Sequence, residues 1–257
     1  MNFPQLHKDL KSLLIQTIRN KLENYHPETE NMPFHWRLLG RDRYAMFSFI
    51  QSVNTTFGTS LWEQMALIIS QASGFEAERQ FQLLGTIDPA TGNLIAQFYR
   101  ELREGVRDPD KKKEIALIRK SIKKGKAQKD PDSTVDFWVK RDSQEEFFEI
   151  TSAKPNKKEF ESLKLKLLRW TALRLSLNKK AKVMTRIAIP YNPYHPEPYR
   201  RWTLKGLYDL KRGEVLVGEE FWDFIAGQEV YQTLLDIFQE AGEELREELD
   251  QYFRKFR

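Results

Sequence analysis

The chain has 257 residues and a formal net charge of +5, and its 40% hydrophobic and 31% charged residues exclude the disordered, collagenous and membrane-spanning classes. We expect a single domain over residues 1–257. The absence of cysteine excludes disulfides, thiolate zinc sites and a cysteine nucleophile, and the four histidines are scattered. Because the charged N-terminus does not fit a signal peptide, we expect a cytoplasmic protein.

Charge is distributed unevenly along the chain. Residues 101–130 hold 11 Lys or Arg against 6 Asp or Glu, and residues 152–182 hold 10 against 2. The last 44 residues reverse the sign, with 12 acids against 4 bases. Because a polyanion responds to the local field, the basic middle predicts a face for nucleic acid, although a solvated helix surface has the same composition.

The N-terminal segment is predicted to be an amphipathic helix over residues 4–24, because Leu and Ile recur there at spacings of three and four. The stretch HPETENMP then breaks the helix. Residues 34–58 are rich in aromatic side chains and end in the turn-prone sequence NTTFG.

A second helix is predicted over residues 59–73, with Thr59 or Ser60 as its cap. Glu63 then falls in the first turn, where a carboxylate also interacts favourably with its own helix dipole. Residues 75–104 read as helical apart from a turn at IDPATGN, and KKKEIALIRKSIKK reads as a basic helix followed by a loop.

The strands are predicted in the second half of the chain. TVDFWVK at 134–140 and EEFFEIT at 145–151 are separated by the turn-forming RDSQ, which favours a hairpin. A basic amphipathic helix over 157–178 precedes an apolar strand over 182–190, and a short EVLVG run and C-terminal helices follow. The expected fold is therefore α/β, with a mixed central sheet flanked by helices.

Two acids of the hairpin, Asp136 and Glu149, are the candidate catalytic carboxylates. Side chains alternate along a strand, so both project from the face opposite to the apolar residues beside them. Those apolar residues are Phe137, Val139, Phe148 and Ile150. Two carboxylates so placed repel each other unless a cation lies between them, and a hard ion such as Mg²⁺ suits carboxylate ligands. We therefore favour a metal site here, and the alternative is that both residues are ordinary surface acids.

A metal held by two carboxylates suits hydrolysis of a phosphodiester, because the ion lowers the pKa of a bound water and neutralises charge on the phosphate. Lys154 follows the second strand closely, just before Pro155 ends the pairing. Its ammonium could orient the attacking water or stabilise the transition state, or it could contact a DNA phosphate.

The segment VDFWVKRDSQEEFFEITSAKPNK resembles the motif of PD-(D/E)xK nucleases, in which an acid on one strand precedes (D/E)-x-K on the next. Pro131 and Asp132 form a literal PD, but Asp136 lies within the strand and is preferred as the first acid. Together with FSFIQSVNTTFGTSLWEQ and VGEEFWDFIAG, the pattern FFEITSAKPN is similar to TdeIII-type restriction endonucleases over roughly residues 34–230.

The resemblance implies a type II restriction endonuclease that cuts double-stranded DNA at a short specific site with Mg²⁺. It also implies a glutamate from an N-terminal helix at the metal, a role that Glu63 could fill, and Ile150 completes the expected ligand set with Asp136 and Glu149. The chain departs from the motif at Thr151, which stands where the general pattern has lysine and cannot supply a cation. Lys154 could replace that charge, or Thr151 could position the water.

Two basic or aromatic segments are candidates for DNA contacts. The first is the start of the basic helix, and the second is the loop 191–202 after the third predicted strand, because Arg and Asn are favoured readers of guanine and adenine. The residues singled out are Lys157, Lys158, Lys164, Asn192, Tyr194, Arg200 and Arg201. A solvated helix face and packing of the loop aromatics on the core are the alternatives.

Other functions remain compatible with these residues. A nonspecific or repair-type nuclease of the same fold would share the acids, and a catalytically inactive nucleic-acid-binding protein would share the basic surface. A homodimer is expected, because cleavage of both strands of a symmetric site is most simply achieved by two active sites related by a two-fold axis. The acidic C-terminal helix EAGEELREELDQYFRKFR is one candidate interface element.

Overall fold

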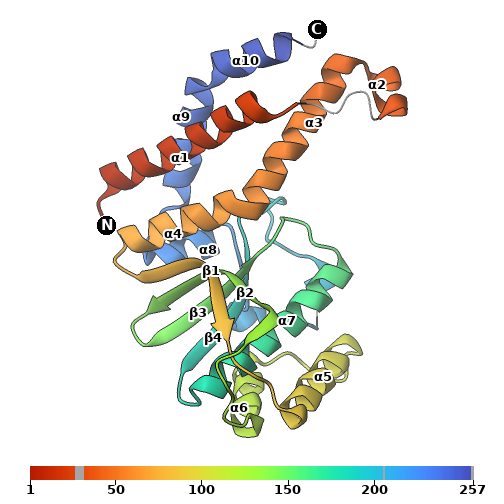
Figure 1. Cartoon of the computed structure of the whole chain (residues 1–257), viewed down its shortest axis with the longest axis vertical. Helices are drawn as coiled ribbons and strands as arrows, with labels where there is room; N and C mark the ends of the chain where they lie inside the picture. Colours follow the sequence, from red (N-terminus) through yellow and green to blue (C-terminus); the bar gives the residue numbers. More distant parts are fainter. Residues whose placement is uncertain (27–31, 205, 256–257) are drawn as a thin grey trace.

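A five-stranded mixed sheet forms the centre of the computed structural model, which describes residues 1–26, 32–204 and 206–255 (Figure 1). Its strands follow one another in the order in which they occur in the chain. The first three pair antiparallel and the last three pair parallel. The strands are β1 (Glu76–Leu84), β2 (Lys129–Arg141), β3 (Gln144–Ile150), β4 (Lys182–Ile189) and β5 (Val215–Val217). The expected α/β fold with a mixed central sheet is confirmed.

Helices cover both faces of this sheet. They are α1 (Phe3–Asn24), α2 (Pro33–Leu39), α3 (Arg41–Thr56), α4 (Trp62–Ala72), α5 (Pro89–Arg103), α6 (Lys111–Ser121), α7 (Lys157–Leu177), α8 (Glu219–Ala226), α9 (Tyr231–Glu244) and α10 (Arg246–Arg254). On one face, α5, α6 and α7 enclose a cluster that we call the α7-side core. On the other, α1, α4, α8 and α9 enclose the α4-side core. No helix of the described residues is long and apolar enough to cross a membrane.

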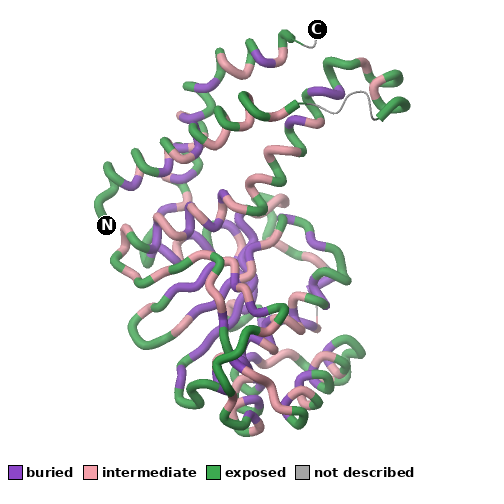
Figure 2. Tube along the Cα trace, viewed as in Figure 1, coloured by how far each residue is buried: buried purple, intermediate pink, exposed green. Residues whose placement is uncertain are grey.

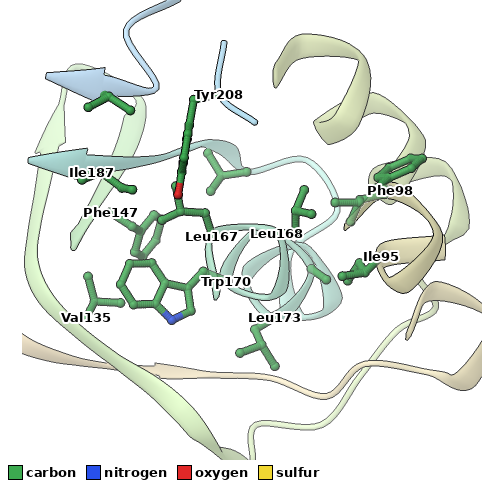
Figure 3. Packing of buried hydrophobic residues seen from close by; sticks show 14 of the residues in the cluster. Ile95, Phe98, Val135, Phe147, Leu167, Leu168, Trp170, Leu173, Ile187 and Tyr208 are labelled. Atoms are coloured by element: carbon green, nitrogen blue, oxygen red, sulfur yellow. The ribbon is translucent and has the colours of Figure 1, made fainter. Parts of the chain in front are cut away.

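Helix α7 connects the parallel strands β3 and β4 and packs along the sheet. It begins with a capping box, in which the Asn156 side chain accepts from the Glu159 N–H and the Glu159 side chain accepts from the Asn156 N–H. Figure 3 shows its Trp170 in the α7-side core, between the helix and Val135 and Phe147 of the sheet. Because Trp138 and Phe147 are also buried in this core, the hairpin is covered on both faces, including the one from which Asp136 and Glu149 are expected to project.

The structure differs from the sequence predictions in the N-terminal half. Residues 76–84 form β1 and not a helix, and the sequence IDPATGN begins α5, with Asp88 as its cap. The predicted turn at NTTFG is also wrong, because α3 continues through a π-helical turn at Phe57–Leu61 into α4. Helix α1 ends at Asn24 as expected, but most of HPETENMP lies outside the described residues.

The acidic C-terminal segment is divided at Leu245 between α9 and α10. Its glutamates face α1, where Glu240 lies 3.1 Å from His7 and Glu248 lies 2.7 Å from Arg19. Figures 1 and 2 show α1, α3 and α10 rising from one side of the sheet, with exposed residues along their outer surfaces. Several acids of the expected interface helix are therefore paired within the chain.

Candidate active site at the open end of the hairpin

The strands β2 and β3 separate at the point where the two predicted catalytic acids lie. Their last paired residues are Phe137 and Phe148. Beyond this pair, the Ile150 N–H of β3 donates its hydrogen bond to the Asp136 side chain and not to the main chain of β2. The acceptor is Oδ2 of Asp136, at 2.8 Å. The separation turns Asp136 and Glu149 towards the same space, as the sequence predicted.

Glu149 is largely buried, with 14% of its side chain exposed, and its Oε2 lies 2.6 Å from Nζ of Lys166 on α7. Burial first, and the Asp136 carboxylate second, raise the pKa of Glu149 to about 7, although Lys166 acts in the opposite direction. Burial also raises the pKa of Asp136 above its ordinary value. Two buried, mutually repelling carboxylates are thus held beside one ammonium, an arrangement that attracts a further cation.

Glu63 of α4 is a third carboxylate near this pair, since Asp136 contributes to raising its pKa, although burial is the main cause. It is only 3% exposed. Its Oε1 accepts a hydrogen bond from Nε2 of Gln80 at 2.8 Å, while its Oε2 is buried without a hydrogen-bond partner among the described residues. The helix is continuous before Glu63, so a free helix N-terminus does not explain this acid.

The described residues contain no group of three or more acidic, histidine or cysteine side chains that could hold a metal ion together. Mg²⁺ does not require one, because it is usually bound through one or two carboxylates and keeps water or phosphate oxygens as its other ligands. Asp136 and Glu149 supply that number, and the main-chain carbonyl of Ile150 follows directly. The Oε2 of Glu63, which has no hydrogen bond to the described residues and lies 3.9 Å from Nε of Arg79, adds a further oxygen. This donor set fits a hard divalent ion.

The structure brings Lys166, and not Lys154, to the carboxylates. Nζ of Lys154 lies over the ring of Tyr194, 5.1 Å from its centre, in the loop that follows β4. Thr151 lies just past the end of β3, where its N–H donates to the Ala188 carbonyl at 3.0 Å. In the sequence, Lys166 is one of several lysines on the basic helix. Only its helical position relative to Glu149 distinguishes it.

Lys164 is a correction to the expected DNA contacts, because it is fully buried. Its Nζ lies 2.8 Å from carboxylate oxygens of both Glu114 and Glu214. Lys111 completes the cluster, with its Nζ 2.9 Å from Glu214. Although burial alone would raise the pKa of Glu214, the two lysines lower it to about 2. Lys164 therefore neutralises buried charge and is not accessible to a phosphate.

The remaining predicted DNA contacts lie on the surface or in the loop after β4. Lys157 and Lys158 are exposed at the start of α7. Because β3 and β4 are parallel, the loop lies at the same edge of the sheet as Glu149. Within it, the Asn192 side chain accepts from the Tyr194 N–H and donates to the Glu197 carbonyl, so this amide shapes the loop.

Two arginines of the loop differ in accessibility. Arg200 is exposed, whereas Arg201 is half-buried with its Nη1 3.3 Å from the Tyr194 hydroxyl. The Tyr199 hydroxyl donates to the Ala153 carbonyl at 3.0 Å, which joins the loop to the chain just after β3. The loop is thus anchored beside the end of β3, and its Tyr199 packs against the α7-side core, as the packing alternative expects.

Comparison with known proteins finds similarity along most of the chain. The family model described as "Type II restriction endonuclease, HinfI" matches residues 3–242. The type II restriction enzyme HgiEI of Herpetosiphon aurantiacus is 26% identical over 232 residues, which cover 88% of this chain and 83% of that enzyme. HgiCII of the same organism is 27% identical over 220 residues, covering 82% and 77%. MjaII of Methanocaldococcus jannaschii is 23% identical over 273 residues, covering 94% and 72%.

Proposed function

Since the chain belongs to the HinfI family of type II restriction endonucleases, we propose that it hydrolyses both strands of DNA at a short specific sequence with Mg²⁺. The observation that carries the proposal is the convergence of Asp136, Glu149 and Lys166 where β2 and β3 separate. We propose that it acts in the cytoplasm, where its substrate lies, and that residues 1–257 fold as one domain, because α1 and α9 pack in the same core as the sheet.

The proposed ligands of Mg²⁺ are the Asp136 and Glu149 carboxylates, the Ile150 carbonyl and, as an alternate ligand, Glu63. When bound there, the ion supplies a water of lowered pKa and neutralises negative charge on the phosphate. Lys166 supplies the ammonium that Thr151 cannot, placed by its contact with Glu149 to stabilise charge that develops on the phosphate in the transition state. The Thr151 hydroxyl can orient the water by hydrogen bonding.

Lys154 is proposed as a DNA-phosphate contact and no longer as the first candidate for the catalytic ammonium, because it lies over Tyr194. Lys157 and Lys158 are proposed to bind phosphates that flank the cut. In the loop, Arg200 is the proposed base reader, because its side chain is exposed. Asn192, Tyr194 and Arg201 are proposed to hold the loop against the DNA.

We also propose that the active enzyme is a homodimer, because two identical active sites related by a two-fold axis match the symmetry of the two DNA strands. Intramolecular pairing of the acidic C-terminal glutamates with α1 removes part of the argument for that helix as the interface. The dimer proposal therefore rests on the symmetry of the reaction.

Plasmid cleavage with Mg²⁺ tests this function. Discrete bands are expected from the wild type, and Glu149→Ala is expected to abolish cutting while DNA binding in Ca²⁺ stays within about twofold, because the carboxylate serves the ion and not the duplex. Asp136→Asn should behave alike. Glu76→Ala is the matched control, since Glu76 is an exposed acid of the same sheet. A smear would identify a nonspecific nuclease, and DNA retention without cutting would identify a binding protein.

A further inference from the structure

Gln80 has an unusual backbone for a residue in the middle of a strand. Its φ is +51°, in the left-handed region that favours glycine. Among the described residues other than glycine, positive φ occurs at one further position, Asp142, which lies in the turn between β2 and β3. A non-glycine residue in this region is strained, and such strain persists only where the surroundings impose it.

The strands β1 and β2 change faces at Gln80. Ala77 packs against the α4-side core and Phe81 against the α7-side core, although residues four apart share a face in a regular strand. The partner strand changes faces as well, because Phe137 lies in the α4-side core and Val135 in the α7-side core. The left-handed residue therefore marks a kink that both strands share.

The kink places Gln80 opposite the catalytic Asp136. The pairs Arg79 with Phe137 and Phe81 with Val135 flank the two residues on both sides. From this position Nε2 of Gln80 donates to Oε1 of Glu63 at 2.8 Å. Within the described part of the chain, the other oxygen, Oε2, has no hydrogen-bond partner, and its nearest cation is Nε of Arg79 at 3.9 Å. In a regular strand, Ala77 and Phe81 would lie on the same face of the sheet, and the side chain of residue 80 would point in a different direction.

We infer that Gln80 is a positioning residue of the nuclease site, held in a strained backbone so that its amide fixes Glu63 with one oxygen directed to the ion or its water. The inference rests on the proposed function. Gln80 itself is exposed and acts on the reaction only through Glu63. It adds a residue of the edge strand β1 to a site otherwise built from β2, β3, α4 and α7.

The strain is tested by urea unfolding of Gln80→Gly and Gln80→Ala in EDTA. Both variants lose the amide, so their difference isolates the backbone. We expect the unfolding equilibrium constant of Gln80→Gly to be about fivefold lower than that of Gln80→Ala, because alanine keeps the left-handed strain. At Glu78, an exposed residue of β1 without positive φ, the glycine variant should instead be the less stable one. If the glycine variant were less stable than the alanine variant at position 80 as well as at position 78, the inference of strain at Gln80 would be overturned.

Positioning is tested by Mn²⁺ affinity and by single-turnover cleavage at saturating enzyme. Loss of a residue that orients a ligand typically costs about tenfold or more in either quantity, so both should fall about tenfold in Gln80→Ala. In a Glu63→Gln background the same change should have no further effect, which a purely structural role would not predict. DNA affinity in Ca²⁺ should stay within about twofold.

The two proposals fail in different ways. If the wild type does not cut DNA, the proposed function fails, and reduced Mn²⁺ affinity of Gln80→Ala would still support the positioning of Glu63. If the wild type cuts and Gln80→Ala cuts and binds Mn²⁺ equally well, the inference about Gln80 is overturned and the nuclease assignment stands. Additive effects of Gln80→Ala and Glu63→Gln would overturn it as well.

Discussion

Replacing Lys164 with methionine tests whether this lysine neutralises buried charge or contacts DNA. Its Nζ donates to both oxygens of Glu114 and of Glu214 over 2.8 to 3.1 Å, and all three side chains are buried. Methionine keeps the unbranched shape and most of the length of the side chain but leaves Glu114 without this ammonium. Removing one partner of a buried ion pair costs about 3–5 kcal/mol, which for a chain of this size lowers the Tm by about 6–20 °C.

The effect should depend on pH. The two lysines lower the pKa of Glu214 from its ordinary 4.5 to about 2, so this carboxylate binds fewer protons in the folded state than in the unfolded state between those values. The stability that it contributes is present above about pH 4.5 and is lost as the pH falls towards 2. The difference between the wild type and Lys164→Met should therefore narrow below pH 4.5.

The assay combines urea unfolding at several pH values with DNA affinity measured against salt concentration. A phosphate contact would show as a salt dependence reduced by about one counterion, with little change in the free energy of unfolding. Lys158→Met, at an exposed position on the same helix, is the matched control. It should show this reduced salt dependence with little change in the free energy of unfolding. The burial of Lys164 as a charge-neutralising residue is refuted if two results occur together. These are a free energy of unfolding of Lys164→Met within about 1 kcal/mol of the wild type and a reduced salt dependence of its DNA affinity.

Three further outcomes are expected. In EDTA at pH 8, Glu149→Gln should raise the free energy of unfolding by about 3 kcal/mol, because burial and Asp136 raise the pKa of Glu149 from 4.5 to about 7. That gain should vanish below pH 4.5, where the carboxyl is protonated in both states, and a gain that persists there would contradict it. Lys166→Ala should lower single-turnover cleavage about 100-fold, whereas Lys154→Ala should mainly weaken binding, and the reverse result would return the catalytic role to Lys154. Light scattering of the protein on cognate DNA should give two chains, and a monomer would refute the dimer.

Local patterns in the sequence were sufficient for the hairpin and for α7, and they singled out Asp136 and Glu149, which interact electrostatically in the structure. Alternating apolar residues flank Asp136 and Glu149, and such alternation predicts strands wherever a sheet has a core beside it. The type II restriction endonuclease identity also followed from the residues around this hairpin, and the family match confirms it. These features depend on short stretches of chain whose own periodicity is informative.

Strand β1 was missed because its sequence, EAERQFQLL, contains good helix formers and no clean alternation. It lies at the edge of the sheet, where half-exposed positions tolerate polar residues on either side. Pairing with β2 decides its structure, and that pairing joins residues between 45 (Leu84 with Lys129) and 64 (Glu76 with Lys140) positions apart. Tertiary context overrode the local preference, and the kink at Gln80 has no local signal at all.

Lys164 and Lys166 show the same limit within one helix. Two residues along an α-helix rotate a side chain by about 200°, so these lysines point to nearly opposite sides of α7. One is buried between Glu114 and Glu214, and the other reaches Glu149. Composition determined that α7 is basic, and its apolar stripe determined that it packs on the sheet. Only the packed structure decided which lysine meets Glu149, because that depends on the rotation at which the helix docks against β3 and β4.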